Sequence, residues 1–284
     1  LAVYAPAVEL GKVLPTTMVE DSPVDTINDK PWPSNATGVY QGNVTVAKAV
    51  KESINTVAVR VLDMVGDETS FNFMQDKFHI QLVRSMSKSG TSYTDIGQAQ
   101  LALGGLTNGV STYDMAAAYS VFPRQGTYIV PRTYSIVTTR DGKVLLRNEK
   151  VEEKNVLSER TTYYMTEMLQ DVVTGGSGAT GKAANFSGQD IAGKTGTTTS
   201  RKDLWFVGYT PYYTAAVWTG YDQQERLSSG LRNPSVTLWQ QVMSEVHKSL
   251  PYKEFEKPDA SNLKTVTYCA SSGMLPGPAC NGHL

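Results

Sequence analysis

The sequence contains little cysteine, little histidine and almost no net charge, and each shortage excludes a class of function. Its 284 residues include 2 cysteines and 3 histidines, and the formal net charge is -1. The histidines, His79, His247 and His283, show no ligand spacing, so we predict no metal site. A pI near 6.4 gives no field that would favour nucleic acid or an anionic membrane surface as a partner.

Long apolar runs are absent as well. No run of about eighteen apolar residues occurs, so no segment is expected to span a bilayer, and no signal peptide opens the chain at Leu1. The chain is therefore expected to be either cytosolic or a fragment of an exported parent. Cys269 and Cys280 share a Gly/Pro/Ser-rich tail. A disulfide there would indicate an oxidising compartment, and two thiols are an equal alternative.

Periodicity predicts helices on either side of short strands. Apolar residues at helical spacing predict helices over 68–77, 95–103, 112–121, 159–173 and 239–250, and a helical stretch from Val44 to Gly66 that breaks at Ser53-Ile54-Asn55. Strands are predicted around 134–139, 144–146, 203–209 and 214–222. Helices flanking an antiparallel hairpin sheet define an α+β fold.

The rest of the chain divides by composition. Residues 1–43, rich in Pro, Asp, Asn and Thr, read as a long irregular excursion whose size predicts that it lines something. Residues 1–257 are expected to form one domain and residues 258–284 a tail of loop or short strand.

The most informative stretch is Lys194-Thr195-Gly196, followed by two strand-like runs. The outward N–H and C=O groups of an edge strand can pair with an extended peptide or a lactam. Lysine adds a positive charge where a substrate carboxylate docks, glycine leaves room for close approach, and the hydroxyls of Thr195 and Thr197 can donate to that carboxylate. The motif, which in isolation is often only a turn, here predicts one wall of a serine acyltransferase cleft.

The same lysine lies in a competing motif. Residues 188–195 match G-x-x-x-x-G-K-[ST], the phosphate-binding loop of nucleotide hydrolases. That chemistry needs a strand before the loop and a helix after it, whereas a Ser/Gly loop precedes this motif and strand-rich sequence follows it. A near-match at 176–182 lacks the final Ser or Thr and follows a helix. The sequence therefore disfavours a nucleotide site, and no cofactor is predicted.

Ser53-Ile54-Asn55, between two predicted helices, is the second element. A Ser and an Asn both compete for backbone hydrogen bonds, which favours a break there. Ser-x-Asn alone is uninformative, but Ser-x-Asn followed by Lys-Thr-Gly resembles the penicillin-binding protein transpeptidases, particularly the C-terminal domain of the bifunctional class A type. The resemblance covers nearly the whole chain and includes residues 40–45 and 49–60, the Ala116-Ala117-Ala118-Tyr119 helix, the Gly126-Thr127-Tyr128 turn and residues 193–222.

The resemblance implies the penicillin-binding/serine β-lactamase-like fold and a D,D-transpeptidase that acts on the D-Ala-D-Ala end of peptidoglycan stem peptides through an acyl-enzyme, with β-lactams as substrate mimics. Ser53 would relay protons and contact the lysine of the nucleophile motif. Asn55 would hold the acyl amide, and Lys194 would polarise that network and the carboxylate. Thr195 and Thr197 would bind the carboxylate, and the Thr197 N–H would form half of the oxyanion hole. The parent would carry an upstream glycosyltransferase domain and would be anchored to the bacterial cytoplasmic membrane, with this domain outside the cytoplasm.

One part of the family pattern is missing. The family places its nucleophile in Ser-x-x-Lys at the start of a helix upstream of Ser-x-Asn, and no such tetrad precedes Ser53. The only match, Ser85-Met86-Ser87-Lys88, follows Ser-x-Asn in a polar stretch and is predicted to be a solvated loop. Residues 1–7 resemble the segment that follows the tetrad. The chain is therefore expected to begin a few residues too late, to contain no nucleophile and to be inactive alone.

Alternatives from different classes stay open. The chain is either a fragment of a D,D-transpeptidase or a non-catalytic relative that recognises peptidoglycan without acylating; a β-lactamase or β-lactam sensor of the same fold would differ in deacylation rate. Family members build their sheet from strands at both ends of the domain, so missing N-terminal strands would expose a sheet edge and part of the core. We therefore expect the chain to keep a separate N-terminal fragment bound or to associate with itself.

Overall fold

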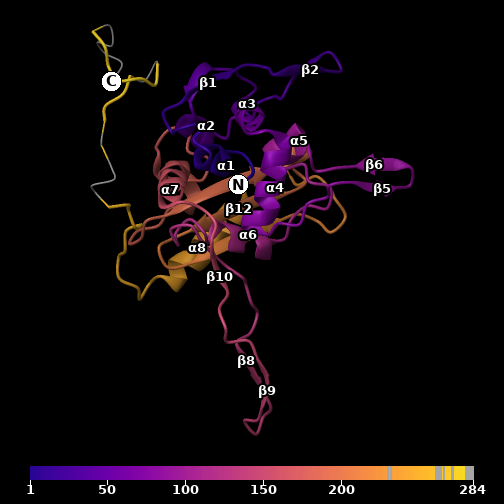
Figure 1. The fold of residues 1–284 in the computed structure, drawn as a ribbon, viewed down its shortest axis with the longest axis vertical. Coiled ribbons are helices and arrows are strands. Elements are labelled where there is room, and N and C mark those ends of the chain that lie inside the picture. The colour runs from indigo at the N-terminus through magenta and orange to yellow at the C-terminus, as the bar shows by residue number, and fades with distance from the viewer. Residues whose placement is uncertain (229, 231, 260–263, 265, 270–271, 279–284) are drawn as a thin grey trace.

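A three-stranded antiparallel sheet forms the centre of the computed structural model. The strand order is β11–β12–β13, with β11 (Ala192–Thr197), β12 (Leu204–Tyr209) and β13 (Thr214–Thr219). Helices cover both faces of this sheet (Figure 1). The structure describes residues 1–228, 230, 232–259, 264, 266–269 and 272–278. The predicted strands over 203–209 and 214–222 and the α+β fold are confirmed.

Helix α8 (Pro234–Val246) covers one face of the sheet. Its Trp239 is fully buried, and the Trp239 ring lies 5.1 Å from that of Phe206 on β12. The prediction of a helix over 239–250 was too late at both ends. The Asn233 side chain accepts a hydrogen bond from the Ser235 N–H, and Pro234 occupies the first turn, so the helix begins five residues earlier than its apolar pattern indicated.

Helices α1 (Tyr4–Glu9), α6 (Thr112–Tyr119) and α7 (Glu159–Thr174) pack on the opposite side, where the larger hydrophobic core lies. Helix α7 packs along β11, and α6 along β12 and β13. The predictions over 112–121 and 159–173 are confirmed. Both helices begin at a serine cap, because the hydroxyls of Ser111 and Ser158 accept hydrogen bonds from the backbone three residues on.

A second group of helices packs together, and Figure 1 draws α2, α3 and α5 of this group above the sheet. It consists of α2 (Val46–Glu52), α3 (Asn55–Val65), α4 (Asp67–Phe78) and α5 (Gln98–Leu103). The predicted break between α2 and α3 is confirmed. Helix α5 starts three residues later than predicted, because the buried Asp95 carboxylate accepts hydrogen bonds from the backbone N–H groups of Val83 and Thr107 instead of opening the helix.

The prediction of an irregular excursion over residues 1–43 was wrong in part. Besides α1, this segment contains β1 (Met18–Asp21), which pairs with β4 (Gly42–Thr45), and β2 (Asp25–Ile27), which pairs with β3 (Lys30–Trp32). Strands of three or four residues are too short to produce a recognisable period, which explains the miss. The segment does line other elements, because β1 packs on α3.

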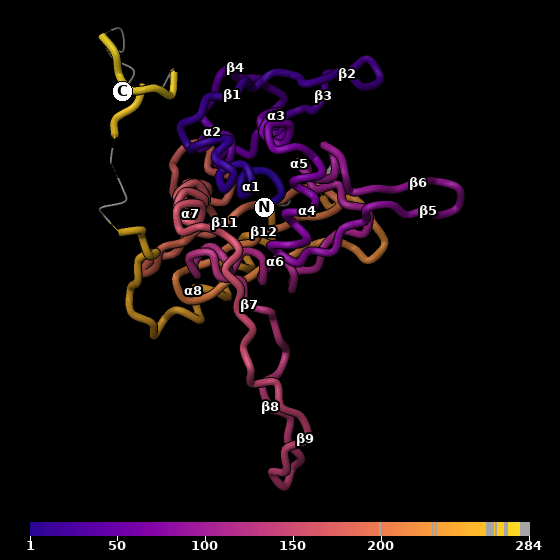
Figure 2. Tube along the Cα trace, in the orientation of Figure 1, coloured from indigo at the N-terminus to yellow at the C-terminus, as the bar shows by residue number. Residues whose placement is uncertain are grey.

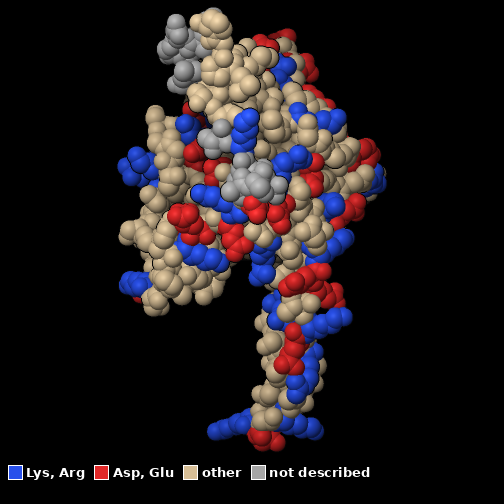
Figure 3. All heavy atoms as spheres, turned by 60° about the vertical axis from the view of Figure 1, so that its left-hand side comes forward, with Lys and Arg blue, Asp and Glu red and all other residues tan. Residues whose placement is uncertain are grey.

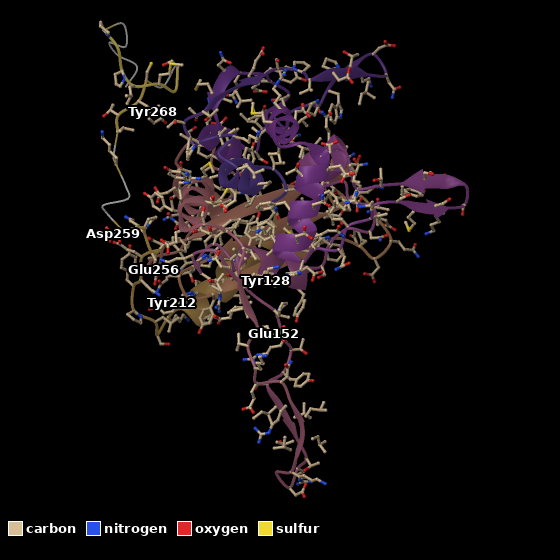
Figure 4. All side chains as sticks on the ribbon, viewed as in Figure 1. Tyr128, Glu152, Tyr212, Glu256, Asp259 and Tyr268 are labelled. Atoms are coloured by element: carbon tan, nitrogen blue, oxygen red, sulfur yellow. The ribbon has the colours of Figure 1, made fainter. Side chains whose placement is uncertain are left out.

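Two hairpins project from the body (Figures 1 and 2). One pairs β5 (Met86–Lys88) with β6 (Thr91–Tyr93), and the other pairs β8 (Ile136–Thr138) with β9 (Val144–Arg147) beyond a base of β7 (Thr127–Ile129) and β10 (Glu153–Asn155). Figure 4 marks Tyr128 and Glu152 where the second hairpin leaves the body. Both hairpins are exposed, so the Ser85-x-x-Lys88 segment is a solvated hairpin and not the loop predicted for it.

The tail after α8 first packs on the core. The ring of Phe255 lies 5.3 Å from that of Tyr209, and beyond it the chain passes Asp259 and Tyr268 (Figure 4). Cys269 is buried, and Cys280 lies outside the described residues. Whether the two cysteines form a disulfide therefore stays open. The boundary between residues 257 and 258 stays a prediction.

Positive and negative side chains are interspersed over the face drawn in Figure 3.

Candidate active site

The side chains of Ser53 and Lys194 meet where the helical layer touches the edge of the sheet. The Lys194 Nζ donates a hydrogen bond to the Ser53 Oγ at 2.8 Å, and it lies 3.3 Å from the Thr195 carbonyl oxygen. These two residues are 141 positions apart in the sequence. The fold therefore brings together the two motifs that the sequence singled out.

Backbone geometry directs the Ser53 side chain toward the strand. Ser53 is the C-cap of α2 and adopts the left-handed conformation, with φ 58° and ψ 52°. That conformation disfavours residues with a Cβ, and non-glycine examples are enriched at functional sites. Asn55 opens the next helix two positions later. The tight turn between α2 and α3 thus carries both Ser53 and Asn55, with only Ile54 between them.

Burial controls the electrostatics of Lys194. Removal of its ammonium group from water lowers the pKa of Lys194 from the ordinary value of 10.5 to about 8. The group remains mostly protonated at neutral pH. It can donate a hydrogen bond and attract an anion, while losing its proton more easily than an exposed lysine would.

Strand β11 carries Lys194, Thr195, Gly196 and Thr197 at the edge of the sheet. The predicted edge position is confirmed, and Thr197 is exposed. Gly196 is paired with Trp205, and a Cβ on Gly196 would lie 3.1 Å from the Trp205 Cβ. The glycine therefore also serves packing within the sheet.

Asp203, the last residue before β12, fixes the connection between β11 and β12. Its carboxylate accepts hydrogen bonds from the Thr198 hydroxyl at 3.0 Å and from the Trp218 Nε1 at 2.9 Å. Sequence reasoning missed this residue, although a carboxylate followed directly by an apolar strand was a usable signal. Asp203 holds the end of the Lys-Thr-Gly strand in place.

The competing motifs do not form sites of their own. Gly193, Lys194 and Thr195 lie inside β11, which continues to Thr197, so the arrangement of a phosphate loop before an α-helix is not formed. Ser85 lies at the base of the projecting β5–β6 hairpin. Among the residues that the structure describes, no group of three His, Cys, Asp or Glu side chains could hold a metal ion.

Comparison with known proteins identifies the family. The family model described as the penicillin binding protein transpeptidase domain matches residues 1–236. The chain belongs to this family, and the resemblance noted from its motifs is confirmed.

Curated relatives agree with this membership. The chain is 38% identical over 283 residues to penicillin-binding protein 1A of Clostridium botulinum, covering 97% of this chain and 32% of that protein. It is 34% identical to penicillin-binding protein 1F of Bacillus subtilis, covering 94% of this chain and 37% of that protein. The chain thus spans about a third of the length of the curated relatives it matches.

Solved structures share the fold. Penicillin-binding protein 1A from Haemophilus influenzae gives a TM-score of 0.76 at 21% identity, over 98% of this chain and 45% of that one. PonA1 from Mycobacterium tuberculosis, solved in complex with penicillin V, gives 0.73 at 24% identity, over 90% of this chain and 70% of that one. Within the described part of this chain, no helix is both long enough and apolar enough to cross a membrane.

Proposed function

We propose that this chain is the substrate-binding part of a peptidoglycan D,D-transpeptidase, which cross-links D-Ala-D-Ala stem peptides through an acyl-enzyme and is acylated by β-lactams. The observation that carries the proposal is the 2.8 Å hydrogen bond between the Lys194 ammonium and the Ser53 hydroxyl beside an edge strand. An edge strand can pair with an extended peptide, and a buried cation can hold the terminal carboxylate of that peptide.

Each side chain has a proposed role within this mechanism. Ser53 relays the proton lost by the attacking serine to the leaving amine, Asn55 holds the acyl amide, and Lys194 polarises Ser53 and attracts the carboxylate. The hydroxyls of Thr195 and Thr197 donate to the carboxylate, and the Thr197 N–H stabilises the oxyanion.

The nucleophile is proposed to lie upstream in the parent protein. The family pattern places the nucleophilic serine in a Ser-x-x-Lys upstream of Ser-x-Asn, and no such tetrad precedes Ser53 in this sequence. We propose that this serine attacks the substrate beside the Ser53–Lys194 pair.

The setting of the parent is part of the proposal. Relatives named penicillin-binding protein 1A are about three times the length of this chain. We propose that the parent is anchored to the bacterial cytoplasmic membrane with this domain outside the cytoplasm, and that a glycosyltransferase domain precedes it.

Intact-mass spectrometry with benzylpenicillin tests the proposal. This chain alone should show no mass shift, because no Ser-x-x-Lys nucleophile precedes Ser53 in it. The longer protein, extended upstream through its Ser-x-x-Lys, should gain one penicilloyl group that peptide mapping places on that upstream serine. An adduct on this chain alone, above all on Ser85, would overturn the assignment, and so would a longer protein that is never acylated.

A further inference from the structure

The segment before Ser-x-Asn contributes buried polar groups to the turn that carries the site. Asp21, Asn35 and Thr56 are 1%, 8% and 0% exposed. They come from β1, from the connection before β4 and from the first turn of α3. Buried polar groups of this kind are costly unless they are fully hydrogen-bonded, so their partners indicate what they hold in place.

Asn35 caps α3 from a distant part of the chain. The N-cap position of α3 is Ile54, whose side chain cannot accept a hydrogen bond. The Asn35 Oδ1 accepts one instead from the Asn55 N–H at 3.0 Å, with the Thr56 N–H at 3.5 Å. A helix start without such an acceptor would leave these donors unsatisfied.

Asp21 fixes the orientation of that cap. Its Oδ1 accepts hydrogen bonds from the Asn35 Nδ2 at 2.7 Å and from the Thr56 Oγ1 at 2.5 Å, and its Oδ2 accepts one from the Gln41 N–H at 2.9 Å. The Asn35 Nδ2 also donates to the Val39 carbonyl at 3.0 Å. Both ends of the Asn35 amide are therefore committed, and the amide can point only one way.

The same segment orients the Asn55 side chain. The Asn55 Nδ2 donates to the Ser34 carbonyl oxygen at 2.8 Å. Both the backbone and the side chain of Asn55 are thus held by consecutive residues, Ser34 and Asn35. A shift of either would move Asn55 and, through the turn, the Ser53 hydroxyl beside Lys194.

We propose that Asn35, oriented by Asp21, is a positioning residue that sets the Ser53–Asn55 turn for acylation. It acts through Asn55 and Ser53 and does not itself contact the substrate. The inference rests on the proposed function, because acylation is the reaction in which the position of the turn matters.

Acylation kinetics of the full-length parent with benzylpenicillin test the positioning role of Asn35. The measurement determines the acylation rate constant separately from the dissociation constant of the noncovalent complex. Asn35→Ala should slow the acylation step by about tenfold or more while changing the dissociation constant little. Asn233→Ala is the matched control, because Asn233 caps α8 on the far face of the sheet and accepts from the Ser235 N–H. Both variants should have a lower melting temperature. At an assay temperature well below that melting temperature, Asn233→Ala should be acylated at the parental rate.

A second pair covers the case in which Asn35→Ala fails to fold. Thr56→Val keeps the side-chain shape and removes one donor to Asp21, so it should slow acylation by about threefold or more. Thr166 lies on α7, and its hydroxyl forms a similar buried hydrogen bond with the Tyr209 hydroxyl on β12 at 3.0 Å. Thr166→Val removes this bond and should leave the acylation rate unchanged. Parental acylation rates in Asn35→Ala and Thr56→Val would overturn the positioning role alone. A parental protein that is not acylated would overturn the proposed function as well.

Discussion

Lys194 combines a lowered pKa with a position at the edge of the sheet. Its ammonium is buried, which lowers its pKa to about 8, and it still lies at the edge of the sheet, where an extended ligand can pair. A lysine tuned in this way is charged when it attracts a carboxylate and also gives up its proton easily.

The lowered pKa of Lys194 predicts how acylation depends on pH. Raising the pH through about 8 removes the charge that attracts the carboxylate, so acylation of the longer protein by benzylpenicillin should fall above that pH. Penicillin methyl ester, which has no carboxylate, should show a flatter decline. A rate that rises steadily between pH 7 and 10 for both compounds would contradict this role of Lys194.

The loss of the Lys194 proton does not itself destabilise the fold. Between the folded pKa of about 8 and the ordinary value of 10.5, the unfolded chain binds more protons at Lys194 than the folded one does. The contribution of this group to stability therefore increases as the pH rises through that window. Activity and the Lys194 contribution to stability should move in opposite directions.

Glycines at the two ends of the longer hairpin differ in what a side chain would meet. Gly126, at its base, has φ +97°, and a Cβ there would lie 2.0 Å from the Leu157 carbonyl oxygen. Gly142, at its tip, has φ +86° and no atom within 4 Å of its Cβ position. The base of the hairpin thus requires glycine for space, whereas the tip requires it only for backbone conformation.

This difference predicts unequal costs for the same substitution. Gly142→Ala should lower the free energy of unfolding by about 1 kcal/mol, the cost of the left-handed conformation. Gly126→Ala should lower it by about 3 kcal/mol or more, because a clash with backbone is added. Urea unfolding monitored by circular dichroism measures both. Equal losses would show that the base of the hairpin relaxes freely.

The existence of the long helices was predictable from the sequence, although the start of α8 was missed, and the short strands of residues 1–43 were not predictable. Helices α4 and α7 have apolar spacing over three turns or more, so their bounds were correct to within about one residue. Strand β1 is defined by its partner β4 more than twenty positions away, which no local pattern reveals, and β2 and β3 have only three residues each. The candidate site divides in the same way: Ser53, Asn55 and Lys194 follow from motifs, while Asn35 acts through contacts that only the fold creates.

The sheet as a whole has two open edges among the described residues. β11 forms one and carries the candidate site, and β13 forms the other. An unpaired edge such as β13 can pair with a further strand. The expected association of this chain with an N-terminal fragment or with itself stays a prediction, which light scattering with mass analysis would decide.

The molecule places its candidate site where two layers meet. The α2–α3 turn brings Ser53 from the helical layer, and β11 brings Lys194 from the sheet. Neither layer contains the site alone. Acylation of the longer protein is therefore expected to depend on this junction.

Stopped-flow acylation of the longer protein by benzylpenicillin tests this dependence on the junction of α2–α3 and β11. Lys194→Ala and Asn55→Ala should each slow acylation by a factor on the order of a hundred, with folding little affected, because each polarises or positions the reacting centre. Lys88→Ala, on the exposed β5–β6 hairpin, should acylate at the parental rate. An unchanged rate in Lys194→Ala, or a large loss in Lys88→Ala, would place the cleft elsewhere on the molecule.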